Sequence, residues 1–183
     1  SAQSQFVDLP SPFPASNQGV FIVDNISTYF RNRVESYFPI ASTISAVVKA
    51  KIGNYLIFFP SYDYMNAVKS EFENHCPEIS VVIQTRAMSE EGKDDFLSNF
   101  EEGNGKTIVG FAVMGGVFSE GIDLKGKRLI GVVIVGVGLP GISVERNLVK
   151  NYFNTSGAGF EYAYQYPGMN RVLQTAGRLI RSE

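Results

Sequence analysis

Residues 55–61 read Tyr-Leu-Ile-Phe-Phe-Pro-Ser, and this stretch decides the fold. A short apolar run bounded by turn residues is typical of a strand that is buried on both faces. Pro60 ends such a strand, and the Ser61 hydroxyl can cap a helix that follows it. The stretch therefore predicts a buried strand that passes directly into a helix.

The sequence on both sides of this strand alternates between helical and strand patterns. Before it, residues 40–52 place apolar side chains at helical spacing behind Pro39, and Gly53 then breaks the pattern. After it, further strands are predicted over 79–83, 107–113 and 129–137, with helices over 61–72, 89–100 and 162–181. This order predicts an α/β fold with a parallel sheet and helices on both faces, whose ligands bind beyond the carboxyl ends of the strands.

Composition indicates one ordinary globular domain. The chain has 183 residues, of which 44% are hydrophobic and 19% charged. Residues 1–19 show no period and predict an irregular lead-in or linker, which leaves 20–183 as the domain. No apolar run is long enough to span a membrane and no signal peptide is visible, so we expect a cytoplasmic protein without a membrane partner.

Two further features limit the class of site. Cys76 is the single cysteine, which excludes a disulfide framework, a four-thiolate iron-sulfur cluster or a zinc ribbon within this chain. Residues 1–105 carry 7 Lys and Arg against 13 Asp and Glu, whereas 106–183 carry 9 against 5. We therefore expect phosphate-binding groups in the second half, although a solvated face explains the asymmetry about as well.

Two glycine-rich strings resemble phosphate loops without the required context. Residues 103–107 (Gly-Asn-Gly-Lys-Thr) precede a strand, whereas a P-loop follows one, so a turn is expected there. Residues 136–141 match the dinucleotide pattern G-x-G-x-x-G, with Glu161 further on, but they follow the last predicted strand rather than the first. A sharp loop is the favoured interpretation, and a Rossmann-type cofactor domain remains a remote alternative.

The string Gly115-Gly116-Val117-Phe118-Ser119-Glu120-Gly121-Ile122-Asp123 directly follows the strand over 107–113. Its glycines allow backbone N–H groups to approach a phosphate, and Ser119, Glu120 and Asp123 add polar side chains at the edge of the sheet. Without a family, a glycine-rich turn capped by Asp is an equally good interpretation.

Near the end of the chain, Gln174, Arg178 and Arg181 have the spacing i, i+4, i+7 and project from one stripe of a helix. Arg is always charged, and its planar group matches phosphate oxygens. A surface helix end with favourable Arg residues explains the same pattern, so the spacing alone indicates only a possible phosphate-facing helix.

Three strings together resemble a known family. Residues 174–181 (Gln-Thr-Ala-Gly-Arg-Leu-Ile-Arg) resemble motif VI, QxxGRxxR, of superfamily 2 helicases. Residues 56–62 resemble motif IV of the DinG/XPD branch, and residues 119–123 resemble its motif V. The resemblance covers residues 21–183 and implies the C-terminal RecA-like domain of a DinG/XPD-family helicase, here ending just after motif VI.

This resemblance implies an ATP-dependent 5′ to 3′ DNA helicase with two RecA-like motor domains. ATP and Mg²⁺ would be shared with the first motor domain, which carries the P-loop and the magnesium-binding residues; this fragment alone would be inactive. The implied catalytic residues are Arg178 and Arg181 as arginine fingers and Gln174 as nucleotide sensor. The implied nucleotide-binding residues are Gly121, Asp123 and Glu120. The residues expected along single-stranded DNA are Ser61, Tyr62, Ser119 and Thr85, with Gln84 and Arg86 as weaker candidates.

Other functions remain open at this point. A DinG-like nuclease-helicase or an ATP-gated nucleic-acid clamp would carry the same motifs, and the fragment does not separate them from a helicase. A plain interaction domain would bind neither nucleotide nor DNA.

Overall fold

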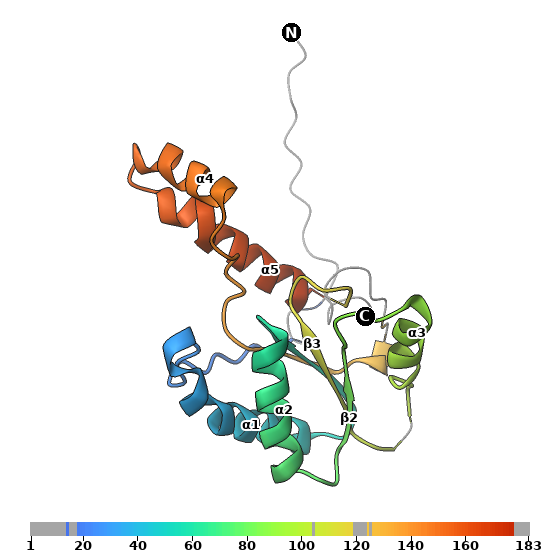
Figure 1. Ribbon diagram of the computed structural model, residues 1–183. Helices are drawn as coiled ribbons and strands as arrows, with labels where there is room; N and C mark the ends of the chain where they lie inside the picture. Colours follow the sequence, from blue (N-terminus) through green and yellow to red (C-terminus); the bar gives the residue numbers. More distant parts are fainter. Residues whose placement is uncertain (1–13, 15–17, 104, 119–123, 125, 178–183) are drawn as a thin grey trace.

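The structure is a computed structural model that describes residues 14, 18–103, 105–118, 124 and 126–177. Four strands form one sheet in the order β2-β3-β1-β4 (Figure 1). Their bounds are β1 (Asn54–Phe59), β2 (Ser80–Ile83), β3 (Ile108–Val113) and β4 (Gly131–Ile134). All three strand pairs are parallel, so the predicted α/β fold with a parallel sheet is confirmed.

Helices cover both faces of this sheet (Figure 1). The long helices α1 (Arg33–Ala50) and α2 (Tyr62–His75) pack on one face, and α3 (Glu90–Ser98) packs on the other. Short 3₁₀ turns lie at Phe30–Asn32 (η2) and Gly126–Arg128 (η3). Each crossover thus brings the chain back to begin the next parallel strand at the same edge.

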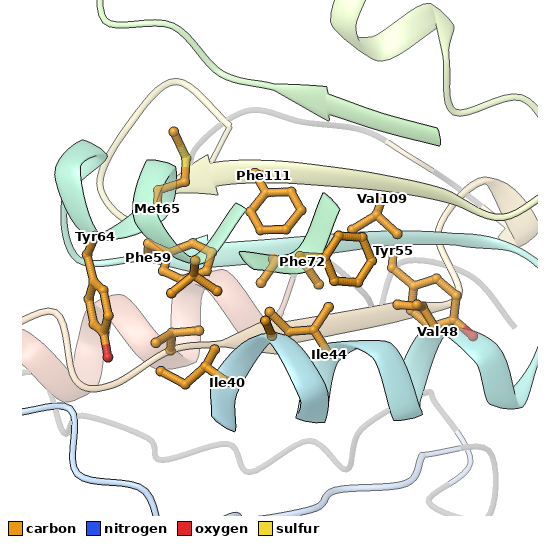
Figure 2. Close-up of a cluster of buried hydrophobic side chains, with 14 of the residues drawn as sticks. Ile40, Ile44, Val48, Tyr55, Phe59, Tyr64, Met65, Phe72, Val109 and Phe111 are labelled. Atoms are coloured by element: carbon orange, nitrogen blue, oxygen red, sulfur yellow. The ribbon is translucent and has the colours of Figure 1, made fainter. Parts of the chain in front are cut away.

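The side chains of β1 alternate between two cores, as the period of a strand requires. Tyr55, Ile57 and Phe59 join the cluster under α1 and α2, which Figure 2 shows. Leu56 and Phe58 point the other way and join the cluster under α3. All six residues of β1 are buried, which explains why the strand appears in the sequence as an unbroken apolar run.

Two boundaries differ from the sequence prediction. Helix α1 begins at Arg33 and runs through Pro39, although a helix was expected only behind this proline. Pro39 lies in the second turn, where it removes one intrahelical hydrogen bond, while Ser36 and Ile40 on either side of it remain buried. Strand β4 is shorter than predicted because the chain turns at Gly136, whose φ of 71° leaves the extended region.

The region after Gly141 is helical, as predicted, and forms a hairpin that extends away from the sheet (Figure 1). It consists of α4 (Val144–Asn154), a π-helical turn η4 (Glu161–Gln165) and α5 (Tyr166–Ala176). No helix in the described part of the chain is long and apolar enough to cross a membrane.

Candidate nucleotide and nucleic-acid interface

The carboxyl ends of the four strands lie along one edge of the sheet. The register aligns Phe59 of β1 with Val113 of β3, and Ile83 of β2 with Phe111 of β3. The segments that leave this edge are the motif IV string at Ser61, the segment after β2 at Gln84, the glycine-rich string at Gly115 and the loop at Gly136. The topology thus brings together strings that the sequence separates by as many as 75 positions.

A buried glutamine joins three of these segments. The Gln84 side chain is only 3% exposed. Its Oε1 accepts a hydrogen bond from the Val113 backbone N–H at 2.9 Å, and its Nε2 donates to the Tyr62 hydroxyl at 3.0 Å. The amide thereby extends the β2–β3 ladder by one bond and ties the start of α2 to both strands. The interpretation of Gln84 as a residue lining the DNA path is wrong, because its side chain is used internally.

The same amide limits which residue can occupy position 116. A Cβ atom on Gly116 would lie 2.7 Å from Gln84 Nε2 and 3.0 Å from the Val113 carbonyl oxygen. Real Cβ contacts are not that short, so the string after β3 needs a glycine there for close packing. This packing fixes how the motif V segment leaves the sheet.

The predicted DNA-facing residues Ser61, Tyr62 and Thr85 lie together at this edge. The Ser61 hydroxyl accepts a hydrogen bond from the Tyr64 N–H and caps α2, as its sequence position predicts. The Tyr62 hydroxyl donates to the Thr85 carbonyl at 3.3 Å. Thr85 itself is exposed. Three residues from two strand ends therefore form one polar surface.

Tyr62 has a partner on one face of its ring. The Arg86 guanidinium lies over the ring at 4.9 Å from its centroid. Arg86 also forms an ion pair with Asp63, Nη2 to Oδ1, at 2.7 Å, but both side chains are largely exposed. Exposed ion pairs contribute little to stability, so this pair can open without much cost. A base that stacks on Tyr62 has the other ring face, or takes the place of Arg86.

Helix α5 is attached to the same edge by Arg171. Its Nη1 donates to the Gly138 carbonyl at 3.2 Å. Its Cζ and Nε lie 3.9 Å from where a Cβ on Gly115 would stand, and Gly115 has a φ of 74° that favours glycine. Arg171 therefore touches both the segment after β3 and the segment after β4. Sequence reasoning missed this residue, because no spacing pattern distinguishes it from a surface arginine.

A glycine on α5 allows a second close contact. A Cβ on Gly168 would lie 2.9 Å from Leu139 Cδ2 and 3.0 Å from Val137 Cγ1. The loop over 136–141 is thus covered by α5, which supports its interpretation as a sharp strand-to-helix loop. The string over 103–107 lies before β3, at the opposite edge of the sheet, and Gly103 and Gly105 both have positive φ, which agrees with the expected turn.

Gln174 is exposed on α5, while its neighbour Thr175 is fully buried and donates to the Arg171 carbonyl at 2.7 Å. The polar and packed stripes predicted for this helix are therefore present as far as Gly177. Leu173, expected on the packed stripe, is instead 63% exposed.

Several predicted site residues lie outside the described residues. These are Ser119, Glu120, Gly121 and Asp123 of motif V and Arg178 and Arg181 of motif VI. The residues that flank motif V are nevertheless fixed in the core. Phe118 is 1% exposed and stacks on Phe96 at 4.2 Å between ring centroids, and Leu124 is 4% exposed. Both ends of this segment are thereby anchored beside the α3 face of the sheet.

A comparison with known families decides the assignment. The sequence profile described as "Helicase C-terminal domain" matches residues 44–183. The chain belongs to this helicase family. The match includes all three motifs that suggested the DinG/XPD resemblance, and the resemblance is confirmed as the XPD/DinG type of superfamily 2 helicase C-terminal domain.

Individual relatives agree with the family. The chain is 29% identical to ATP-dependent DNA helicase CHL1 of Coccidioides immitis, with 84% of this chain and 21% of the relative covered. It is 23% identical to a probable ATP-dependent helicase of Methanocaldococcus jannaschii, with 99% of this chain and 29% of the relative covered. The helicase domain therefore spans about a fifth to under a third of the length of these relatives.

Solved structures show the same fold. An apo structure of XPD superposes with a TM-score of 0.66 at 20% identity, covering 84% of this chain and 31% of that one. S. tokodaii Xpd4 superposes with a TM-score of 0.57 at 18% identity, covering 84% and 29%. The predicted RecA-like parallel sheet with helices on both faces is thus confirmed for the helicase domain.

Proposed function

We propose that this chain is the second motor domain of an ATP-dependent 5′ to 3′ DNA helicase, and that it supplies arginine fingers to ATP bound on a first motor domain. The observation that carries the proposal is the convergence of motif IV, the segment after β2, the motif V segment and α5 at one edge of the sheet. Arg171 joins α5 to this edge through the Gly138 carbonyl. Relatives that are named ATP-dependent DNA helicases support the activity and the choice of DNA.

In this proposal motif VI acts on the nucleotide. Arg178 and Arg181 would neutralise the charge that develops on the transferring phosphoryl group, and Gln174, which is exposed on α5, would contact the nucleotide. Gly121, Asp123 and Glu120 of motif V would complete the nucleotide side. Hydrolysis of ATP with Mg²⁺ held by the first motor domain would supply the free energy for stepping. An arginine finger in this class of enzyme contributes about 10³ to 10⁵ in rate.

Single-stranded DNA would pass over the polar surface at the start of α2. Ser61, Tyr62, Thr85 and Ser119 would position its backbone, because hydroxyls and backbone amides bind phosphates without reading the sequence. The half-exposed Tyr62 ring adds a stacking surface, and base stacking on an aromatic ring is worth about 1 to 3 kcal/mol.

The test is DNA-stimulated ATP hydrolysis by the full-length protein, comparing the wild type with Arg178→Ala and Arg181→Ala. We expect turnover to fall by about a hundredfold or more in at least one variant, as for a lost finger. Lys127→Ala is the matched control, since Lys127 is an exposed cation next to the amino ends of the strands. Normal hydrolysis by both arginine variants, with circular dichroism showing that they remain folded, would refute the assignment.

Polarity and unwinding need a separate assay. We expect the full-length protein to unwind a duplex with a 5′ single-stranded overhang and not one with a 3′ overhang. Hydrolysis of ATP without unwinding of either duplex would favour the ATP-gated clamp instead. Cleavage of the DNA would favour the nuclease-helicase.

A further inference from the structure

A second basic residue lies at the carboxyl edge, outside the three helicase motifs. Arg33 is the first residue of α1. This helix ends at Ala50, just before β1 begins at Asn54, so its other end lies at the carboxyl edge of the sheet. The contact between Arg33 and Tyr64 in the first turn of α2 agrees with this position. Arg33 therefore lies beside the turn that carries Ser61 and Tyr62.

Aromatic rings hold the Arg33 guanidinium in place. Its Cζ lies 4.7 Å from the centroid of the Tyr64 ring and 5.2 Å from that of Phe30. The Tyr64 ring is 2% exposed, and its hydroxyl shares a hydrogen bond with the Ser36 hydroxyl. It also packs edge-on against Phe59 of β1. A cation on such a rigid ring has already lost most of its side-chain freedom, so ligand binding costs little more.

The charge of this guanidinium is not neutralised within the described part of the chain. No carboxylate of the described residues lies within 4.0 Å of it, and its buried Nε has no hydrogen-bond partner there. Of the acidic residues nearby in sequence and fold, Asp63 is paired with Arg86. Glu35 lines a groove on another face of α1, together with Pro39 and Thr43.

A fixed planar guanidinium without a carboxylate matches one kind of ligand best. Its remaining donors form the fork that binds phosphate oxygens, and phosphodiesters are the anions that the proposed DNA track brings to this edge. We propose that Arg33, held between Phe30 and Tyr64, binds a backbone phosphate of the single strand that passes over the first turn of α2. This inference rests on the proposed function, and it extends the track from α2 to α1.

The experiment is a salt titration of binding between the full-length protein and a fluorescent oligothymidylate, followed by anisotropy. Each phosphate contact with a single strand contributes about 0.7 to the slope of log K against log salt concentration. Arg33→Met keeps the length of the side chain and removes its charge, so we expect weaker binding and a slope that is shallower by about 0.7. Arg33→Lys keeps the charge, and we expect it to keep the slope.

Arg31→Met is the matched control. Arg31 lies two positions away, is exposed and forms none of the ring contacts that hold Arg33. We expect its slope to equal that of the wild type. An equal loss of slope in both variants would show a diffuse positive field rather than a site, and would overturn the proposal.

A second variant keeps the proposal testable if Arg33→Met does not fold. Phe30 is 84% exposed, so Phe30→Ala removes one ring without opening the core. A cation–π contact at an exposed site is worth about 0.5 to 1 kcal/mol, which predicts binding about two- to fivefold weaker at an unchanged slope. Unchanged affinity of Phe30→Ala would overturn the ring-held geometry.

The outcomes separate this inference from the function on which it rests. Absence of salt-dependent binding to single-stranded DNA by the wild type would refute the proposed function. Salt-dependent binding by the wild type with an unchanged slope in folded Arg33→Met would refute only the role of Arg33. Competition by inorganic phosphate beyond that of chloride at equal ionic strength would indicate an isolated phosphate site and would overturn the assignment to a DNA backbone.

Discussion

The substitution Gln84→Leu tests whether a buried amide holds the candidate interface together. Leucine has a similar size but lacks both polar atoms, so it removes the bonds to the Val113 N–H and to the Tyr62 hydroxyl. Val113 is 8% exposed, and its N–H would lose its partner in a site that water does not reach. A buried donor without a partner costs about 1 to 3 kcal/mol, and a lost neutral hydrogen bond about 0.5 to 1.5 kcal/mol. We therefore expect the free energy of unfolding to fall by about 2 to 4 kcal/mol.

Urea denaturation followed by circular dichroism measures this change. The comparison variant is Tyr62→Phe, which removes the hydroxyl bond and leaves the bond to Val113, so it should lower the free energy of unfolding by only about 0.5 to 1.5 kcal/mol. An m-value equal to that of the wild type is needed for both. A loss below about 1 kcal/mol for Gln84→Leu, or equal losses for the two variants, would refute the reasoning that Gln84 completes the β2–β3 ladder.

Two further predictions concern α5 and the core. Arg171→Met removes the charge-assisted bond to the Gly138 carbonyl, which is worth about 1.5 to 3 kcal/mol; amide exchange over residues 166–176 should accelerate about tenfold or more by mass spectrometry, and an unchanged rate would show that Gly168 packing alone docks the helix. Burial raises the pKa of the Tyr64 phenol, against smaller lowering effects from Ser36 and Arg33, so the neutral form is favoured in the folded state. This contribution to stability is fully present below the unfolded pKa of about 10 and is lost as pH rises through the folded pKa. Denaturation midpoints measured from pH 9 to 11 should therefore fall less steeply for Tyr64→Phe than for the wild type, and parallel curves would contradict the assignment.

The strands were predictable because their burial is written into their composition. β1 is central and covered on both faces, so every position is apolar and the pattern does not depend on its neighbours. The helix caps at Ser61 and Ser89 were predictable for a similar reason, since each hydroxyl bonds to an N–H only three residues ahead. The start of α1 was not predictable, because burial against α2 outweighs the local preference of Pro39 against a helix.

The site divides in the same way. Motifs IV, V and VI are recognisable because each keeps its polar residues within a single short segment. The roles of Gln84 and Arg171 depend on partners 22 to 33 positions away, and nothing in the local sequence distinguishes a bridging amide or guanidinium from an exposed one. Thr85 and Arg86 follow Gln84 directly, yet they are exposed while Gln84 is buried.

The sequence by itself determined the order of strands and helices, the helix caps and the three motif strings, because these depend on burial patterns and hydrogen bonds among residues close along the chain. Only the tertiary structure decided that the motif IV segment, Gln84, the segment after β3 and α5 meet at one edge. It also decided that Arg33, far from any motif, lies beside the first turn of α2. Such pairings are set by the strand order β2-β3-β1-β4, and parallel pairing between distant strands depends on how whole buried faces pack rather than on any local pattern.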